Sequence, residues 1–412
     1  MHLNPFIPKS SEFYQLPITN YQLPMRKFIQ RKIPLAWLQL TREKPRLLVA
    51  LAGIAFADIL MFMQLAFQQA LFDSNVRLHS SLDGEIVLIN PQSNAINFLE
   101  SFSQRRLYQT LALSEVASVH PIYLGLTEWK NPETRALAEV LVIGTNPRDK
   151  VFNLPGVQQN IEKIKLPDVV LFDRGSRPEF GAIASEFEQG KKITAEVGGR
   201  RIKVGGIAEL GASFGSDGNL ITSDQNFLRL FKDRKYGLID LGVIKLKPAA
   251  NAEIVLEKLR QYLPDDVKVF SKQEFIDYEK DYWARSTPIG FIFTLGTIMG
   301  FIVGTVIVYQ ILYSEVSDHL SEYATLKAMG YTQTYLLLVV FQEALILASL
   351  GYVPGFAFAI LQYNLARNAT LLPIFMTASR AVMVFLLTVL MCFISGFIAV
   401  RKLRSADPAD IF

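Results

Sequence analysis

Residues 289–313 read IGFIFTLGTIMGFIVGTVIVYQILY and contain no charged residue. A helix of about 20 apolar residues crosses the hydrocarbon core of a bilayer, so this stretch is long enough to do so. It is followed at 315–332 by EVSDHLSEYATLKAMGYT, and another apolar stretch follows from residue 335. The sequence therefore predicts two membrane helices that are joined by one short, acidic segment.

Two more apolar stretches bring the number of predicted membrane spans to four. One lies near the N-terminus and is interrupted only by Asp58, and the other lies close to the C-terminus. The composition agrees, because 50% of the 412 residues are hydrophobic and only 19% are charged, against about 25% charged in soluble domains. The predicted spans are 46–71, 287–314, 333–361 and 380–400.

Basic residues flank the first and last spans and predict the orientation of the chain. Cytoplasmic flanks of membrane helices carry an excess of Lys and Arg. The basic residues concerned are Arg26, Lys27, Arg31, Lys32, Arg42, Lys44 and Arg46 before the first span, and Arg401, Lys402 and Arg404 after the last. We therefore expect a multi-pass protein of the plasma (inner) membrane with both termini in the cytoplasm. The connecting segment 315–332 and the tail 401–412 would then be cytoplasmic, and the loop 362–379 would face outward.

The region before the first span predicts a helix at 25–45 that lies in the membrane interface. Apolar residues recur there at helical spacing among basic ones: Ile33, Trp37 and Leu40. Such a pattern is typical of interfacial amphipathic helices, and Pro45 would interrupt the helix before the chain enters the membrane. Residues 1–24 are proline-containing and carry few charges. We expect them to form a disordered extension, and Met25 offers an alternative start.

The stretch between the first and second spans, 72–286, predicts an α/β domain. Strand, helix and strand patterns follow one another in two halves, 72–139 and 237–286. Two such units around a middle section are typical of a split βαβ domain whose halves pair into one sheet. The middle section 140–236 is predicted to be an inserted subdomain, with a β-hairpin at Gly198-Gly199. The fold class is therefore an α-helical membrane protein with four transmembrane helices and a large outward α/β domain.

Motifs that carry chemistry are few. The sequence has no GxxxxGK(S/T) phosphate loop, so any ATP dependence must come from a partner. The histidines and Cys392 lack metal-ligand spacing, which predicts no metal site, and no basic-aromatic stripe indicates nucleic acid. GASFG at 211–215 fits an esterase nucleophile motif, but the later histidine, His319, would lie across the membrane. We expect no catalytic residue and interpret Ser213 as part of a flexible glycine-rich loop.

The predicted spans contain a few polar and small residues. Asp58 is expected to face the bundle interior, where we interpret it as making a structural hydrogen bond to a neighbouring helix or lining a wet stalk. Proton relay and substrate contact are the alternatives. Glu343 is expected to reach the interface or contact the interface helix. In the second span, small residues recur every four positions and predict close helix packing, either in a homodimer or within one protomer: Gly296, Gly300 and Gly304.

The connecting segment predicts a helix at 318–329. Gly330 would end it in the left-handed conformation, and Thr332 would cap the next span. Asp318 and Glu322 lie one turn apart, so their charges repel by about 0.2–0.5 kcal/mol. A partner with basic residues would relieve this repulsion, whereas an ordinary solvated loop is the alternative.

The same segment resembles a family signature. EYATLKAMG at 322–330 is similar to the E-x-A-x-L-(R/K)-A-x-G motif of the FtsX/MacB superfamily of ABC-transporter permeases. The C-terminal ADPADIF resembles the family's D-P-x-(E/D)-A-L, with Ile411 in place of Ala, and WLQLTREKPRLLVALAGI resembles its N-terminal amphipathic helix. The first span further resembles the DevC branch found in cyanobacteria. The matching residues are Glu322, Ala324, Leu326, Lys327, Ala328 and Gly330, with Asp407, Pro408 and Asp410 in the tail.

This resemblance implies that the connecting segment is a coupling helix, which seats in a groove of a separate ABC ATPase. The residues it assigns to coupling are Asp318, His319, Glu322, Tyr323, Leu326, Lys327, Ala328 and Gly330. It also implies a MacB-like outward domain, a homodimer with two ATPase subunits, and no substrate tunnel through the spans. ATP-Mg would be held by the partner, with no cofactor bound directly by this chain.

The implied function is that of the permease subunit of a tripartite efflux pump. Movement of the ATPase would be transmitted to the periplasmic domain (mechanotransmission). This movement would drive a glycolipid or similar amphiphile from the periplasm, or from the membrane lipids of the outer leaflet, into a membrane-fusion adaptor and a TolC-like outer-membrane channel. One alternative is an FtsX-like mechanotransmitter that activates a periplasmic hydrolase without transport, and another is a lipoprotein-release permease. An outward-facing sensor would need a cytoplasmic output domain, for which the tail leaves little room.

Overall fold

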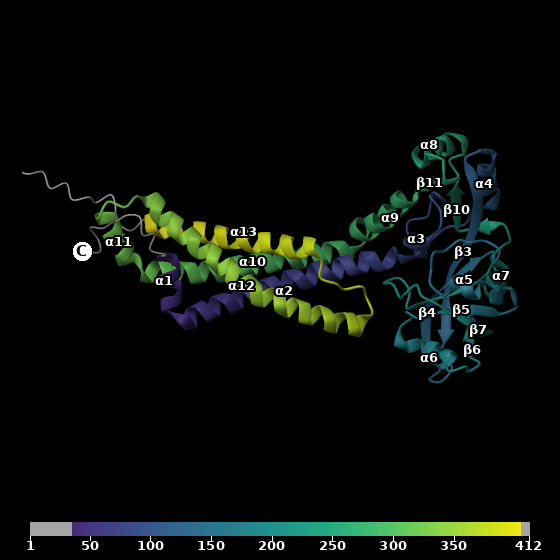
Figure 1. Ribbon diagram of the computed structural model, residues 1–412, viewed down its shortest axis with the longest axis horizontal. Helices are drawn as coiled ribbons and strands as arrows, with labels where there is room; N and C mark the ends of the chain where they lie inside the picture. Colours follow the sequence, from purple (N-terminus) through teal and green to yellow (C-terminus); the bar gives the residue numbers. More distant parts are fainter. Residues whose placement is uncertain (1–34, 405–412) are drawn as a thin grey trace, which may run out of the picture.

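The computed structural model describes residues 35–404 and has two parts, a bundle of long helices and an α/β domain (Figure 1). We call residues 76–286 the α/β domain and the four long helices the membrane bundle. Residues 1–34 and 405–412, which include the predicted extension, the start of the interface helix and the tail motif, lie outside the described residues.

Four helices in the described chain are long and apolar enough to cross a membrane, as predicted. They are α2 (Lys44–Asn75), α10 (Pro288–Asp318), α12 (Gln333–Thr370) and α13 (Ala378–Arg404). Helix α2 runs past its expected end at residue 71, and α2 and α10 reach from the bundle to the α/β domain (Figure 1). The bundle is therefore joined to the α/β domain by the ends of two of its own helices.

Helix α12 continues beyond the predicted end of the third span at residue 361. The loop between α12 and α13 is therefore shorter than the predicted loop 362–379. The helix ends at Thr370, and seven residues connect it to α13. Packing explains the extension, because Tyr363 is buried and its hydroxyl donates a 2.7 Å hydrogen bond to the carbonyl of Phe62. A side chain anchored to α2 in this way stabilises the extra helical turns.

The α/β domain is built on one nine-stranded sheet, with the strand order β11-β1-β10-β3-β4-β8-β5-β7-β6. The strands are β1 (Ile86–Ile89), β3 (Val116–Lys130), β4 (Leu137–Thr145), β5 (Val169–Asp173), β6 (Thr194–Val197), β7 (Arg200–Ala208), β8 (Gly218–Ser223), β10 (Leu241–Leu246) and β11 (Lys268–Ser271). A separate two-stranded sheet pairs β2 (Phe102–Ser103) with β9 (Leu238–Ile239).

The strands of the two predicted halves pair with one another, since β1 lies between β10 and β11. The middle section 140–236 was expected to be an inserted subdomain, and its strands extend the same sheet. Strand β4 pairs with β3 from Ile122 to Lys130, and β8, β5, β7 and β6 continue the same sheet. The predicted hairpin is confirmed, with β6 and β7 joined through Gly198 and Gly199, both at positive φ.

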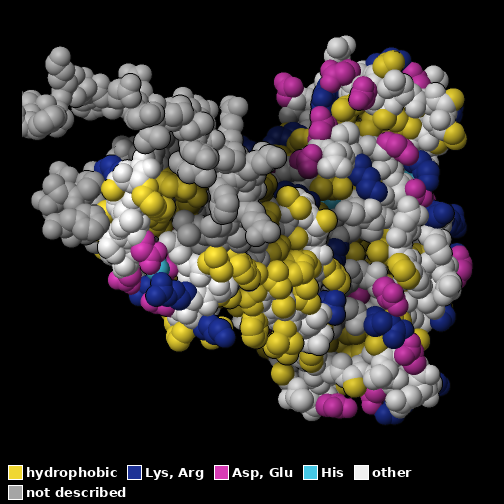
Figure 2. All heavy atoms as spheres, turned by 60° about the vertical axis from the view of Figure 1, so that its left-hand side comes forward, with side chains coloured by type: hydrophobic (Ala, Val, Ile, Leu, Met, Phe, Trp, Pro, Cys, Tyr) yellow, Lys and Arg dark blue, Asp and Glu magenta, His cyan; other side chains and the backbone are white. Residues whose placement is uncertain are grey.

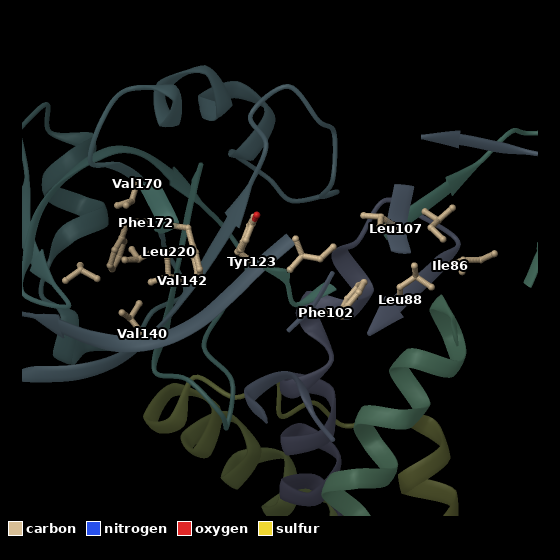
Figure 3. Close-up of a cluster of buried hydrophobic side chains, with 14 of the residues drawn as sticks. Ile86, Leu88, Phe102, Leu107, Tyr123, Val140, Val142, Val170, Phe172 and Leu220 are labelled. Carbon is tan, nitrogen blue, oxygen red and sulfur yellow. The ribbon is translucent and has the colours of Figure 1, made fainter. Parts of the chain in front are cut away.

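Apolar side chains from the sheet and its covering helices form two large buried clusters in the α/β domain. Figure 3 shows part of one, in which Phe172 and Leu220 lie in one group, Ile86 and Leu88 lie in another, and Tyr123 lies between the two. The domain contains no cysteine, so this packing stabilises it without disulfides. The single cysteine of the chain, Cys392, is buried in α13.

Shorter helices complete the fold. They are α1 (Leu35–Arg42), α3 (Arg77–Ser81), α4 (Gln104–Gln109), α5 (Val157–Asn160), α6 (Ile183–Glu188), α7 (Asp224–Leu230), α8 (Ala252–Tyr262), α9 (Lys272–Asp281) and α11 (Leu320–Ala328). A π-helical turn at Tyr282–Ser286 connects α9 to α10. Helix α11 lies at the end of the bundle far from the α/β domain (Figure 1).

Candidate functional site at the two ends of the membrane bundle

The connecting segment 315–332 forms a helix, although a shorter one than predicted. Helix α10 continues to Asp318, and α11 begins at Leu320. Gly330 has a positive φ of 94°, and the side chain of Thr332 accepts a hydrogen bond from the Tyr335 backbone at the start of α12. Both predicted end signals are therefore confirmed.

The acidic residues of this segment are paired with basic residues of the same chain. Arg46, in the first turn of α2, lies 2.6 Å from Asp318 and 3.3 Å from Glu315. Glu322 lies 3.1 Å from the Nδ1 atom of His319 and 3.5 Å from Arg42. The repulsion between Asp318 and Glu322 is thus relieved within the protomer, which corrects the expectation that a partner's basic residues are needed.

One face of α11 packs into the bundle. Tyr323 is only 1% exposed and Ala324 is also buried, while Leu326 packs against a cluster that includes Val316 and Val340. Burial raises the pKa of the Tyr323 hydroxyl, and the nearby Glu343 carboxylate raises it further. Because Tyr323 and Leu326 hold the helix against its own protomer, they are anchoring residues rather than an open docking surface.

The other face of α11 and the turn after it are open. Lys327, Ala328 and Gly330 are exposed, as are two apolar side chains that the sequence reasoning missed. Met329 is 63% exposed, and Tyr331 is 43% exposed, with its ring 4.9 Å from that of Tyr335. Figure 2, which brings this end forward, shows acidic and basic side chains gathered beside a broad apolar surface of the bundle. Apolar residues that follow closely on one another and are all exposed, here Met329, Tyr331 and Tyr335, are typical of a contact surface.

At the other end of the bundle, the loop 211–216 contacts α2, the short helix α3 and the π-helical turn that precedes α10. Arg77 donates a 3.1 Å hydrogen bond to the carbonyl of Ala212, and the Phe214 backbone N–H donates to Ser74 in α2. The Phe214 ring meets Trp283, in the π-helical turn that precedes α10, edge to face with centroids 5.6 Å apart. The loop thus bridges α2–α3 and the π-helical turn.

This loop was expected to be flexible, and the structure corrects that interpretation. The hydroxyl of Ser213 accepts hydrogen bonds from the backbone N–H groups of Gly215 and Ser216, both at 3.1 Å. Asp173 accepts from the N–H groups of Leu210 and Gly211. The hydroxyl therefore stabilises a turn, and the loop is fixed by partly buried polar contacts that the sequence motif does not reveal.

A buried polar contact that the sequence reasoning missed holds α3 to α9. The Glu279 carboxylate accepts hydrogen bonds from the Ile96 backbone N–H at 2.9 Å and from the Trp283 indole at 2.8 Å. His79 lies 3.4 Å from the same carboxylate, and both side chains are almost fully buried. The sequence does not predict this contact, because His79 and Glu279 are far apart in the chain and come together only when α3 packs on α9.

Comparison with protein families now identifies the chain. Residues 47–262, more than half of the 412, match the MacB-like periplasmic core domain family. Residues 290–408 match the FtsX-like permease C-terminal family. The chain belongs to the FtsX/MacB superfamily of ABC-transporter permeases. Membership implies an inner-membrane protein that works with an ABC ATPase partner, and the α/β domain is its periplasmic domain. Comparison with curated proteins gave no match.

Solved structures similar to this permease cover its periplasmic domain. The periplasmic region of MacB from Actinobacillus actinomycetemcomitans is 15% identical, covering 49% of this chain and 94% of its own, with a TM-score of 0.35. The extracellular domain of the noncanonic ABC-type transporter YknZ from Gram-positive bacteria is 11% identical, covering 46% and 100%, with a TM-score of 0.33. A domain of a putative permease from Porphyromonas gingivalis is 12% identical, covering 47% and 88%, with a TM-score of 0.28.

Inside the permease bundle, Asp58 makes a structural hydrogen bond to a neighbouring helix, which is one of the roles expected of it. Its Oδ1 atom accepts a 2.6 Å hydrogen bond from the Thr388 hydroxyl, which joins α2 to α13. Glu343 is fully buried in α12, so it does not extend to the interface, and contact with the interface helix stays a prediction. Both acids are held by the packing of the bundle.

The three glycines of α10 pack within the protomer. A Cβ atom at Gly296 would lie 2.5 Å from the Gln64 side chain, and one at Gly304 would lie 2.7 Å from Ala57, both on α2. At Gly300 the nearest atom would be in Met61 of α2, at 3.3 Å. The glycine row is therefore occupied by α2 and is not free to form a homodimer contact.

Proposed function

We propose that this chain is the permease subunit of an ATP-driven tripartite efflux pump, in which it transmits movement of an ATPase to the periplasmic domain. One observation carries the proposal: α2 is a single helix whose first turn contacts the connecting segment and whose last turn contacts the loop 211–216. Arg46 binds Asp318 at one end, and Ser74 accepts from Phe214 at the other. A 32-residue helix is about 48 Å long, so α2 links the two ends rigidly.

The ATPase is proposed to dock on the exposed side of α11 and the turn after it. Lys327, Met329 and Tyr331 offer a mixed basic and apolar surface there, while Tyr323 and Leu326 hold the helix to the bundle. ATP-Mg would be bound and hydrolysed by the separate subunit, and this chain would act without its own cofactor. Changing a conformational equilibrium from 1:99 to 99:1 needs about 5.5 kcal/mol of differential binding, which nucleotide-driven closure of two ATPase subunits supplies.

In the proposed assembly the permease is a homodimer with both termini in the cytoplasm. Its periplasmic domain would engage a membrane-fusion adaptor and a TolC-like outer-membrane channel. The resemblance of the first span to the DevC branch favours a glycolipid or similar amphiphile as the exported substrate. The extended sheet and the fixed loop 211–216 support a domain that moves as a unit when α2 and α10 move.

The docking surface is tested by co-expressing the permease with an ABC ATPase from the same genome. Met329→Asp places a charge at an exposed position, so folding should be unaffected while copurification and ATP turnover in the complex fall at least tenfold. Leu166→Asp is the matched control, because Leu166 is 60% exposed in the α/β domain. Unchanged recovery of the ATPase with the Met329 variant would place the contact elsewhere.

Transmission is tested at the other end with Phe214→Ala, which removes the ring contact to Trp283. The variant should bind the ATPase and hydrolyse ATP as the parent does, yet export an amphiphile several-fold more slowly. Tyr236→Ala is the control, because this ring is 76% exposed in the same domain. Intact ATPase coupling without export in the parent protein would instead support the FtsX-like relay.

A further inference from the structure

An open cavity of about 370 Å³ lies at the end of the membrane bundle that faces the α/β domain. Residues from α2, from the end of α9 and from the start of α13 line it. The polar and charged ones include Gln68, Gln69, Asp73, Lys280, Ser379 and Arg380. None of these residues makes the contacts by which α2 is proposed to transmit movement from the connecting segment to the loop 211–216.

Arg380 is the unusual member of this group. Its side chain is buried, with the residue only 5% exposed, and it makes no ion pair among residues 35–404. Its guanidinium donates hydrogen bonds to the Phe375 carbonyl at 2.9 Å and to the Gln69 side chain at 2.6 Å. These bonds use two of its five N–H donors. A buried charge without an opposite charge is costly, so the cavity has a cationic group that a bound anion would stabilise.

The guanidinium of Arg380 lies over the Tyr363 ring, 5.5 Å from its centroid, but no carboxylate among residues 35–404 pairs with this arginine. It lies in the first turn of α13, where the helix dipole adds positive potential, and that turn contains no acidic residue. The other two charges of the cavity neutralise each other, since Lys280 lies 3.3 Å from Asp73. The cavity lining thus carries one net positive charge at the level of the membrane boundary.

A shallow, open apolar groove continues from the cavity along the surface of α13, and its lining residues all belong to that helix. It shares Ser379 and Met383 with the cavity and extends through Leu386 to Leu390. From Ser379 to Leu390 the helix rises about 17 Å, which is close to half of the roughly 30 Å hydrocarbon core. The groove therefore has the length and polarity for an acyl chain in one leaflet.

We propose that this cavity and groove bind an anionic phospholipid of the leaflet that faces the α/β domain. The phosphate would lie against Arg380, with an acyl chain along the α13 groove. The charge balance distinguishes this site from general lipid contact, because an anionic headgroup neutralises Arg380 and a zwitterionic one does so less well. The site stands independently of the proposed efflux function.

The test uses the full chain purified in detergent and native mass spectrometry of lipid adducts. Phosphatidylglycerol should bind at least tenfold more tightly than phosphatidylcholine with the same acyl chains, and Arg380→Gln should remove this preference. Arg367→Gln is the matched control, because Arg367 lies near the same end of the bundle, outside the cavity, against Phe375. Equal binding of the two lipids, or equal losses in the two variants, would overturn the proposal.

A second variant separates binding from folding, since Arg380→Gln changes a buried side chain. Leu386→Trp fills the groove and leaves Arg380 in place, so phosphatidylglycerol binding should weaken several-fold while the melting temperature stays within a few degrees. Undiminished binding by this variant would exclude the groove as the acyl-chain site. Millimolar inorganic phosphate should compete poorly, and strong competition would show that the cavity binds free anions instead of lipid.

Discussion

Arg46, in the first turn of α2, binds Asp318, the last residue of α10, at 2.6 Å. The same guanidinium lies 3.3 Å from Glu315, whose side chain is only 4% exposed. One basic residue thus joins the start of the first membrane helix to the end of the second. The ends of α2 and α10 that lie next to α11 are therefore held together.

Arg46→Gln is expected to destabilise this joint. The substitution leaves the buried Glu315 carboxylate without its guanidinium partner, so we expect a loss of about 1–3 kcal/mol in the free energy of unfolding. Thermal unfolding in detergent measures the loss, and Arg42→Gln is the control, because the Arg42–Glu322 pair is largely exposed. If the two variants lost equally little free energy of unfolding, the buried contact of Arg46 with Glu315 would stabilise the protein no more than a surface ion pair does.

Glu279→Ala should destabilise the contact between α3 and α9. It leaves the Ile96 N–H and the Trp283 indole N–H buried without their acceptor, at a cost of about 2–5 kcal/mol. Glu279→Gln keeps one acceptor oxygen and should lose less. Asp281→Asn, in an exposed pair with Arg285, should change the melting temperature little. A small loss for Glu279→Ala would mean that water replaces the carboxylate.

Two glycine substitutions in α10 should differ in their effects. At Gly304 an added Cβ would lie 2.7 Å from the Cβ of Ala57, which cannot move without its backbone, whereas at Gly300 the nearest atom is 3.3 Å away. Gly304→Ala should therefore cost about 1–3 kcal/mol through overpacking, and Gly300→Ala less than about 1 kcal/mol. Thermal unfolding tests the order. If instead both variants kept their stability and lost dimer formation, the glycines would contact a second protomer.

Asp83→Asn is expected to give a pH-dependent loss of stability. The Lys245 ammonium, 2.6 Å away, holds the pKa of Asp83 below its usual range. A carboxyl whose pKa is lowered by folding stabilises the fold above its unfolded pKa, about 3.9, and loses this contribution as the pH falls through the folded value. We expect the parent to exceed the variant by up to about 1 kcal/mol at pH 7 and the difference to shrink below pH 4. Unfolding curves at several pH values measure it, and a constant difference would contradict the ion-pair explanation.

Local patterns in the sequence determined the helices, the caps and the family. Long apolar runs form membrane helices because each buried backbone group in lipid must be hydrogen-bonded within its own segment. Gly330, Thr332 and the Gly198-Gly199 hairpin are likewise local, since backbone conformation and nearby hydrogen bonds decide them. The motif at 322–330 indicated the superfamily for the same reason, because it is read from consecutive residues.

Only the tertiary structure decided which residues act together. Arg46 with Asp318, and Glu279 with His79, are distant in sequence and meet only when helices pack. The sheet incorporates the section expected to be an inserted subdomain, because β4 offers β3 a long pairing edge. Exposure of Met329 and burial of Tyr323 depend on how α11 rotates against the bundle. Sequence periodicity gives a helix its faces, but contacts with distant segments select the face that is buried.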